Sequence, residues 1–298
     1  MISIVVVNHD RKELLKRCLD SVRGQTFGDT ETIVVDNTSS DGSIEMLCTY
    51  YPEVTLIRNT GNVLFCRAYN QGIDASKGAF VLCLNNDTAL DKEYLNQMLF
   101  AAGLDTKVGM VSGKILRMDG GTIDSTGLFL GRNRKPVERG YGEKDMGQYD
   151  KAGYVFGVSG ACAFFKKSML MDIKDKHGYF DERFGMYYED LDLCWRAHKK
   201  GWRAYYNPKA LVYHVRGGSA VGHKKGKGPN FLYLPDGLKE MYIRNRYRCI
   251  RKNDTLFGYI LNLPFILLYD IRLWVYICLN SLLKFINKLF MLDGDIET

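Results

Sequence analysis

Three short stretches of this 298-residue chain place carboxylates or an imidazole where they could take part in chemistry. Asp87 follows a continuously apolar run, AFVLCL, after two asparagines. Asp190 follows two tyrosines and a glutamate, and His214 lies in VYHV just before two glycines. A carboxylate at a buried strand end suits Mg²⁺ or Mn²⁺, and a carboxylate beside aromatic rings suits removal of a proton from a sugar hydroxyl. The stretches therefore suggest a metal site and a proton-accepting site.

Each stretch also has a purely structural explanation. Asp87 could end a turn before the next helix, and a single histidine such as His214 is more often structural than a metal ligand. The acids of residues 189–192 match the dipole of a helix whose last turn carries Lys199 and Lys200. The helix dipole leaves unexplained why two aromatic residues directly precede the acids.

Asp36 ends another apolar run, ETIVV. At the carboxyl edge of a parallel sheet its carboxylate could accept hydrogen bonds from a nucleotide base or a ribose. The alternative is that Asp36, Ser39 and Asp41 form turns and cap the following helix.

The elements that must position these residues follow from hydrophobic patterning. ISIVVV, ETIVV, VTLI and AFVLCL are short β-branched runs, typical of a parallel sheet covered on both faces. Helical patterns separate them, one after an Asp10 cap and one over YLNQMLFAAG after an Asp91 cap. We expect a doubly wound, mostly parallel α/β sheet over about the first 110 residues.

Beyond Gly113 the pattern weakens, which indicates hairpins and a mobile loop up to about Tyr154. Regular structure returns with the run VSGACAFF, a helix from about Glu189 to Lys200 ended by Gly201, and the strand ALVYHV. A basic, glycine-rich stretch and a hydrophobic tail follow.

Composition narrows the class of protein. The eight cysteines form no CxxC pair, which favours a reducing cytoplasm and argues against a zinc site. The first residues do not resemble a secretory signal. Much of the net charge of +7 lies between Lys224 and Lys252, so the expected partner is local and anionic, a phosphate or an acidic lipid headgroup, and not nucleic acid.

The tail suggests attachment to a membrane surface. Residues 256–269 lack charge but number only 14 and contain Pro264, short of the ~20 that a spanning helix needs. From 270 to 288 one helical face is polar, which predicts an amphipathic helix in the plane of the membrane. Its polar residues are Asp270, Asn280, Ser281, Lys284, Asn287 and Lys288. Five basic residues precede it and would add attraction to anionic lipids: Arg244, Arg246, Arg248, Arg251 and Lys252. The alternative is docking on the catalytic domain or on a second subunit, as in a homodimer.

Taken together, the motifs resemble those of family 2 glycosyltransferases, most closely the rhamnosyltransferase-like branch. The resemblance spans residues 2 to about 220 and depends on several motifs in order. They are VVVNHDR, VVDNTSSDGS, NTGNVLFCRAYNQGI, LNNDT, VSGACAFFKK, GYFDERFGMYYEDLDLCWRAHKKGWR and VYHVRGGSA.

The resemblance implies an inverting enzyme with the GT-A fold that uses Mg²⁺ or Mn²⁺. It would transfer a sugar from a dTDP or UDP donor to a glycan or lipid-linked glycan. By likeness, Asp190 would be the catalytic base, and Asp87 and His214 would be metal ligands. Asp36 would bind the base of the nucleotide. Asn85 and Asn86 stand where many relatives have carboxylates, so Asp87 is the one strong anionic ligand of that element. The other implied donor-binding residues are Val7, Asn8, Asn37, Asn62, Asn70, Asn85, Asn86 and Gly160; the implied acceptor-binding residues are Tyr187, Tyr188 and Glu189.

The expected domains are a GT-A domain over 1–220 and a basic loop with a helical tail over 221–298. Residues 1–112 would bind the nucleotide sugar and 113–220 the acceptor, with the protein on the cytoplasmic face of the membrane. Two rival functions stay open at this point. A sugar-1-phosphate nucleotidyltransferase should have a glycine-rich loop near its amino terminus, which VVVNHDRKELL lacks. A non-catalytic nucleotide-sugar sensor would need no base at Asp190.

Overall fold

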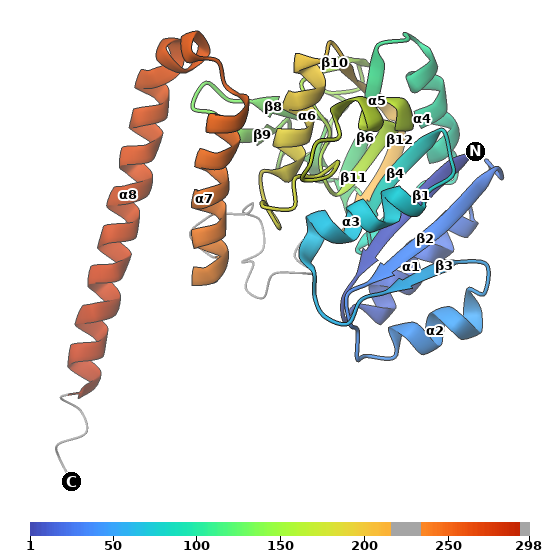
Figure 1. Ribbon diagram of the computed structural model, residues 1–298, viewed down its shortest axis with the longest axis horizontal. Coiled ribbons are helices and arrows are strands. Elements are labelled where there is room, and N and C mark those ends of the chain that lie inside the picture. Colours follow the sequence, from blue (N-terminus) through green and yellow to red (C-terminus); the bar gives the residue numbers. More distant parts are fainter. Residues whose placement is uncertain (216–233, 293–298) are drawn as a thin grey trace. The chain divides into compact units, whose positions relative to one another are not determined.

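The computed structural model describes residues 1–215 and 234–292, with side chains described up to residue 279. The chain divides into two compact units. The first joins Met1–Leu130 to Pro136–Asn253, and the second joins Gly131–Lys135 to the segment that starts at Asp254. The first unit contains the central sheet and the helices that cover it (Figure 1).

The amino-terminal half of the sheet is parallel, in the order β3-β2-β1-β4. Its strands are β1 (Ile2–Asn8), β2 (Thr30–Asp36), β3 (Thr55–Arg58) and β4 (Phe80–Asn85). The helices between them are α1 (Lys12–Arg23), α2 (Ser43–Tyr50) and α3 (Leu64–Ala75). The apolar runs of β1, β2 and β4 are buried because helices cover these strands, whereas the edge strand β3 is only partly buried. This arrangement confirms the predicted α/β class.

The second half of the sheet is mixed. β11 (Cys162–Lys166) lies antiparallel between β4 and β6 (Val108–Arg117), and β12 (Arg203–His214) runs parallel to β6. Short strands complete the sheet: β5 (Thr88–Leu90), β7 (Ile123–Ser125) and β10 (Gly153–Val155). β8 (Leu128–Leu130) and β9 (Pro136–Glu138) form a separate hairpin, so hairpins do occur between residues 113 and 154. The helices of this half are α4 (Tyr94–Gly103), α5 (Lys167–Ile173) and α6 (Glu189–Lys199).

Two helix starts test the sequence-based caps. The predicted helix after Asp91 has the bounds of α4, but Asp91 is not its cap. Glu93 occupies the N-cap position without a side-chain cap hydrogen bond, and Asp91 Oδ1 accepts from the backbone N–H of Glu93 at 3.0 Å. The predicted Asp10 cap is wrong. Asp10 bonds to Ser40 instead, and the N–H of Lys12 at the start of α1 donates to Asp41 Oδ2 at 2.7 Å. An acid from the next loop therefore serves α1, which local sequence does not reveal.

Helix α7 (Asp236–Asn253) belongs to the first unit, which therefore extends well past residue 220. One side of α7 is buried, and the fully buried side chains include Asn245 and Arg246. Lys252 forms ion pairs with Asp181 and Asp192, two buried acids of the first unit. The prediction that the basic residues of this segment face a membrane is thus wrong for Arg246 and Lys252. Arg246 is fully buried, and Lys252 is largely buried in its ion pairs.

Helix α8 (Leu256–Leu292) runs without interruption through Pro264. Its segment Leu256–Leu279 is 24 residues long and is long and apolar enough, by length and composition, to cross a membrane. The helix is therefore longer than the uncharged stretch 256–269, because Asp270 and Arg272 do not end it, and its length does not argue against spanning. The in-plane orientation stays a prediction. The remaining polar positions of the predicted amphipathic face, from Asn280 to Lys288, and the basic stretch GHKKGKG lie outside the described side chains.

Within the second unit, the tip of the hairpin between β8 and β9 packs on the first turns of α8. Arg134 forms a buried ion pair with Asp254 at 2.6 Å and donates to the carbonyl of Gly258 at 2.9 Å. The guanidinium of Arg132 lies 3.9 Å from the ring centroid of Phe265. Many other large apolar side chains of α8 remain exposed.

Candidate active site

The parallel strands end together and bring polar side chains to one edge of the sheet. Asn8 at the end of β1 pairs in register with Asp36 at the end of β2, and Val7 pairs with Asn85 of β4. Asn86 Nδ2 donates to Asn8 Oδ1 at 2.8 Å, and Asn8 Nδ2 donates to Asp36 Oδ2 at 3.1 Å. We call this row of strand ends the carboxyl edge. The register of the strands thus brings together polar side chains that are far apart in the sequence.

Asp36 is fully buried at the carboxyl edge. Its two oxygens accept hydrogen bonds from the backbone N–H and the hydroxyl of Ser39, at 2.8 and 2.6 Å. The turn proposed as the structural alternative is therefore present. The carboxylate lies where the resemblance expects a nucleotide, but it also stabilises the loop after β2.

The predicted donor-binding asparagines divide into two groups. Asn37 lies beside Asp36 and receives a hydrogen bond from Asn59 at 2.9 Å, and Asn62 Oδ1 accepts from the N–H of Leu64 at the start of α3. Asn70 is buried elsewhere, because its amide bonds both backbone polar groups of Phe180, at 2.8 and 2.9 Å. Asn70 is therefore a link between α3 and the loop before α6 rather than part of the carboxyl edge.

Asp87 and His214, the two predicted metal ligands, are brought together. The register of β5 on β12 pairs Thr88 with His214, and His214 Nε2 lies 3.1 Å from Asp87 Oδ1. The other ring nitrogen, Nδ1, lies 2.8 Å from Asp124 Oδ2 on β7. Both carboxylates and the ring are buried. Asp124 was missed by the sequence analysis, and no motif around it pointed to this role.

The two carboxylates favour positive charge at this site. Burial alone would lower the pKa of His214, but hydrogen bonds with Asp124 and Asp87 raise it to about 9. The imidazolium donates to a carboxylate from each nitrogen in this state. Metal-binding histidines usually have the same kind of support. A carboxylate accepts a hydrogen bond from one ring nitrogen and so orients the other nitrogen towards the metal.

The donor chemistry of this site fits a divalent cation that takes its other ligands from elsewhere. Asp87 offers an oxygen and His214 Nε2 a nitrogen, and Asp124 orients the ring. Within residues 1–215 and 234–279, no group of three or more side chains is arranged to hold a metal by itself. A cation here would therefore need oxygens from a bound phosphate or from water.

Asp190 is the second residue of α6 and is half-buried. Its Oδ1 accepts a hydrogen bond from the N–H of Leu191 at 2.7 Å, and its Oδ2 lies 3.3 Å from the N–H of Gly160. Gly160 is a predicted donor-binding residue. A Cβ there would lie 3.6 Å from Asp190 Oδ2, an ordinary van der Waals distance, so the contact does not require glycine. Asp190 therefore lies beside Gly160 and remains partly accessible.

The three acids of the first turn of α6 occupy different environments. Glu189 is buried, and burial together with the charge of Asp190 raises the pKa of its carboxyl well above the usual value. Asp192 is fully buried and binds Arg196, Lys252 and Asn253. A helix-dipole explanation treats the acids alike. These acids differ in burial and in hydrogen-bond partners, so the helix dipole alone does not account for them.

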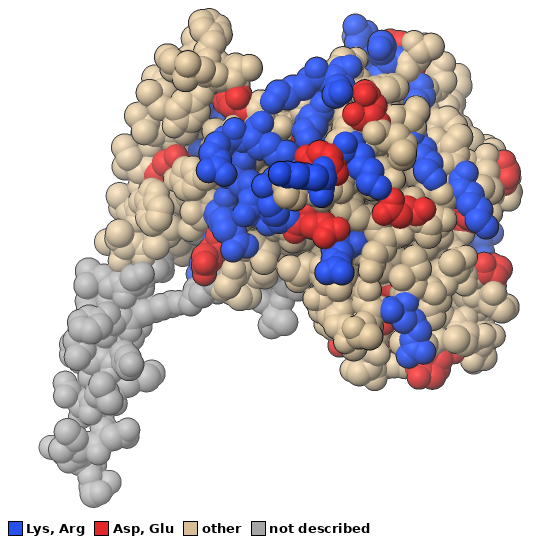
Figure 2. All heavy atoms as spheres, in the orientation of Figure 1, with Lys and Arg blue, Asp and Glu red and all other residues tan. Residues whose placement is uncertain are grey.

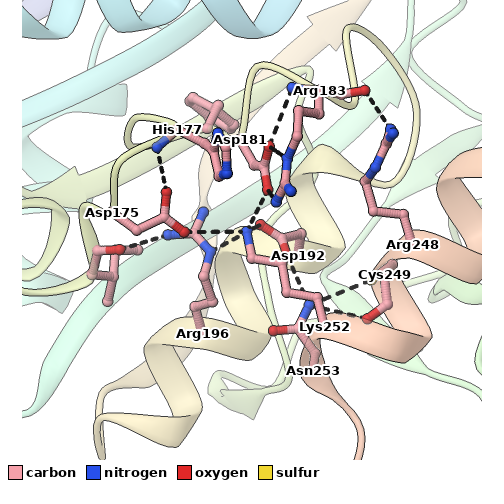
Figure 3. A network of polar contacts seen from close by, with 12 residues as sticks. Asp175, His177, Asp181, Arg183, Asp192, Arg196, Arg248, Cys249, Lys252 and Asn253 are labelled. Atoms are coloured by element: carbon pink, nitrogen blue, oxygen red, sulfur yellow. Dashed lines mark hydrogen bonds and ion pairs between the residues drawn. The ribbon is translucent and has the colours of Figure 1, made fainter.

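A polar network joins α6 and α7 behind these acids (Figure 3). Lys252 Nζ lies 2.7 Å from Asp181 and 3.1 Å from Asp192, and Arg196 bonds Asp192 at 2.8 Å. Burial would raise the pKa of Asp181, but hydrogen bonds from Arg183 and Lys252 hold it well below its usual range. Buried charges of both signs therefore fasten α7 to the start of α6.

The loop of residues 184–188, here called the aromatic loop, adopts unusual backbone angles. Tyr187 and Tyr188 have φ values of +68° and +70°, in the left-handed region that bulky residues rarely adopt. The ring of Tyr188 is buried against Tyr242 of α7, with centroids 5.0 Å apart. The implied role of Tyr188 in acceptor binding is therefore wrong, because its ring is buried, whereas Tyr187 is only half-buried.

Asn245 of α7 holds the aromatic loop in place and was also missed by the sequence analysis. Its Nδ2 lies 2.7, 2.8 and 3.0 Å from the carbonyl oxygens of Phe184, Met186 and Tyr187. Asn245 is fully buried, and its amide is the side-chain donor that these carbonyl oxygens face. The strained loop that leads into Asp190 thus depends on a residue 55 positions further along the chain.

Comparison with known proteins agrees with this geometry. A model of glycosyl transferase family 2 matches residues 3–174, more than half of the chain. The chain belongs to glycosyl transferase family 2. The match covers the carboxyl edge and Asp87, and ends before Asp190, His214 and α7. The roles of those later residues in this family 2 protein therefore depend on its own structure.

Two curated relatives and one solved structure illustrate the range of the likeness. Poly-beta-1,6-N-acetyl-D-glucosamine synthase of Staphylococcus aureus is 26% identical over 217 residues, covering 71% of this chain and 49% of that protein. N-acetylglucosaminyl-diphospho-decaprenol L-rhamnosyltransferase of Mycobacterium tuberculosis is 26% identical over 255 residues, covering 77% and 79%. The chain thus spans about half the length of the first relative.

The mannosyltransferase PcManGT of Pyrobaculum calidifontis, solved with GDP-Man and Mn²⁺, has a TM-score of 0.59 at 16% identity, covering 89% of this chain and 68% of that one. This likeness establishes the fold, which is the GT-A fold expected from the sequence.

Proposed function

We propose that this protein is an inverting glycosyltransferase that moves a sugar from a nucleoside diphosphate donor to a hydroxyl of a saccharide or lipid-linked saccharide. The observation that carries the proposal is the meeting of Asp87, His214 and Asp124 next to the carboxyl edge. In open α/β sheets this edge is where nucleotides bind. Family membership supports the reaction class, and synthesis of cell-surface polysaccharide or glycoconjugates is the expected setting.

The donor would bind along the carboxyl edge. Asp36, Asn37 and Asn8 offer hydrogen-bonding groups for a base and a ribose, with Val7 beneath them in β1. Rhamnose from a dTDP donor is our first choice, because the relative from Mycobacterium tuberculosis is a rhamnosyltransferase, and UDP sugars come next. Asn62, Asn85, Asn86 and Gly160 complete the proposed donor site.

Asp87 and His214 would hold Mg²⁺ or Mn²⁺, with Asp124 fixing the imidazole. When bound, the cation supplies positive charge that neutralises the departing diphosphate. Asp87 is the only full negative charge among these ligands, and the diphosphate would complete the coordination. The Mn²⁺ in the solved mannosyltransferase supports a divalent cation in general and does not choose between the two metals.

Asp190 would accept the proton of the acceptor hydroxyl as that oxygen attacks the anomeric carbon from the face opposite the leaving group. A single displacement inverts the configuration at that carbon. The N–H groups of Gly160 and Leu191 orient the carboxylate, and the Asp190 side chain is partly exposed. Tyr187 is the aromatic residue left to contact the acceptor sugar. Glu189, the other implied acceptor-binding residue, is buried.

We further propose a cytoplasmic location on the inner face of the membrane, with attachment through α8. The exposed side chains of Leu256, Phe257 and Ile260 support an apolar contact with lipid. Pairing of two copies through this helix is the competing use of the same surface.

The proposal is tested by hydrolysis of nucleotide sugars in the absence of acceptor. Purified protein is offered dTDP and UDP sugars with Mg²⁺, with Mn²⁺ or with a chelator. We expect slow, metal-dependent release of one nucleoside diphosphate. Tight donor binding without any release, with or without acceptor glycans, would instead favour a nucleotide-sugar sensor.

A further inference from the structure

One side of α7 presents a row of arginines to solvent. Arg244, Arg248 and Arg251 are spaced four and three residues apart, so they lie on the same helical face. Arg244 and Arg251 are exposed and Arg248 is partly so, whereas Asn245 and Cys249 on the other side are buried. The arginine row is therefore the outer face of a helix whose inner face packs on α6.

A fourth arginine joins this row from the loop before α6. Arg183 binds the buried carboxylate of Asp181, and its carbonyl oxygen accepts a hydrogen bond from Arg248 Nη1 (Figure 3). Partial burial lowers the pKa of Arg248, and the nearby charges of Arg244, Arg183 and Arg251 lower it further. Arg183 thus adjoins Arg248 through this hydrogen bond, and we call the four arginines of the row and the loop the arginine surface.

Two exposed acids adjoin the arginine surface in the sequence, Glu182 beside Arg183 and Glu240 one helical turn before Arg244. Asp181 is buried and is shared between Arg183 and Lys252, and Arg244 and Arg251 form no ion pair within the described part of the chain. Lys199, which is exposed, adds charge close to the end of α7, where its Nζ lies 3.4 Å from the carbonyl of Lys252. Figure 2 shows Lys and Arg side chains gathered over the part of this face where α6 and α7 lie. Like charges held together repel each other, and an anionic partner would relieve this repulsion.

The shape of the surface indicates the kind of anion. Arg244 and Arg251 are seven residues apart, about 10 Å along the helix axis. Arg244 and Arg251 are exposed on the outer face of the helix, and Arg248 lies partly exposed between them, bonded to Arg183 and Asn245. The arginines form a row and not a cavity, so they can meet several phosphates side by side more readily than enclose one. We propose that the arginine surface binds the anionic headgroups of a membrane. This contact belongs to the first unit and goes beyond the attachment through α8 proposed above.

The test uses the full-length chain and two vesicle populations, one of phosphatidylcholine and one containing phosphatidylglycerol. The measured quantity is the binding to the phosphatidylglycerol vesicles divided by the binding to the phosphatidylcholine vesicles. Apolar binding by α8 contributes to both and cancels in this ratio. The double substitution Arg244→Gln and Arg251→Gln should lower this ratio about 25-fold at low salt, about fivefold for each arginine. Both residues are exposed, so donor hydrolysis should stay unchanged, and this readout separates the proposal from the proposed function.

A matched control removes two exposed charges elsewhere, Arg17→Gln with Lys77→Gln. The proposal is overturned if the control lowers the ratio as much as the arginine variant, or if the arginine variant keeps the preference for phosphatidylglycerol. A third measurement uses inorganic diphosphate as the probe. Tight, one-to-one binding of diphosphate that the arginine variant loses would also overturn it, because the surface would then be a site for a single phosphate ligand.

Discussion

Asp87 and Asp190 are both carboxylates at the end of a regular element, but the chain fixes them by different means. Asp87 directly follows β4, and the pairing of β5 with β12 sets its distance from His214. Asp190 follows a loop with two left-handed tyrosines, held by Asn245 and Tyr242 of a later helix. Backbone pairing therefore positions the proposed donor side, and buried side-chain contacts position the proposed acceptor side.

The largest effect is expected at Asp190. Asp190→Asn should keep the fold and donor affinity, because the amide can still accept a hydrogen bond at the helix start. Turnover should fall about 10²–10⁴-fold, since the amide cannot take the proton. The measurement is transfer rate and donor affinity side by side. Glu189→Gln and Asp192→Asn are the controls, and near-normal turnover in Asp190→Asn would remove the base assignment.

On the donor side, Asp87→Ala should cost more than His214→Ala, because Asp87 is the only full charge among the proposed ligands. We expect about a 10²–10³-fold loss of metal-dependent turnover, the scale of several kcal/mol of charge stabilisation. Asp124→Asn should weaken apparent metal affinity about 10–100-fold. Titration of activity with Mn²⁺ measures both effects. If all three variants depended on Mn²⁺ in the same way as the unsubstituted protein, the result would argue against a cation at this site.

Asn245→Asp tests whether α7 positions the aromatic loop. The carboxylate has the size of the amide but cannot donate to the three carbonyl oxygens that it would face. Turnover with acceptor should fall up to about 100-fold while donor affinity holds, because the start of α6 shifts and the carboxyl edge does not. Asn207→Asp is the matched control, since Asn207 is also buried and donates to a backbone carbonyl, that of Gln97. A parallel loss in both variants would mean general destabilisation.

The smallest effect concerns stability and pH. The pKa of Asp181 in the folded protein lies below its value of about 4 in the unfolded chain, so its contribution is present above pH ~4 and is lost as pH falls below that. Lys252→Met should lower stability at pH 7 and flatten its decline towards pH 3. Urea unfolding at both values measures this, with exposed Lys199→Met as control. An unchanged decline would show that Lys252 does not hold this pKa down.

Strands β1, β2 and β4 could be predicted because each contains a continuous apolar run whose polar residues begin where the strand ends. The end of AFVLCL, for example, correctly located Asn86 and Asp87 at the sheet edge. The buried strand β6 was not predicted, because Gly109, Ser112 and Lys114 interrupt its apolar pattern. The bounds of α6 also followed from local signals, namely acids in its first turn and Gly201 with φ +81° after its end. The caps were less predictable, as at α1, because Asp41 reaches Lys12 from a loop 29 positions away.

The carboxyl-terminal segments show the limit of composition as evidence. The basic run before residue 253 suggested a surface, yet Arg246 is fully buried and Lys252 pairs with Asp181 and Asp192. Pro264 suggested a break, yet α8 continues through it. Charge and proline content do not specify which side of a helix meets the protein, because that depends on the partner surface.

By itself, the sequence determined the α/β class, the strand ends at which Asp36 and Asp87 lie, the acidic start of α6 and the family to which the chain belongs. These properties depend on hydrophobic periodicity and on residues close to one another along the chain. The tertiary structure alone decided that Asp124 supports His214, that Tyr188 faces inward and that Asn245 secures the aromatic loop. Each of these contacts joins segments more than 50 residues apart, and only packing of the whole unit brings such segments within hydrogen-bonding distance.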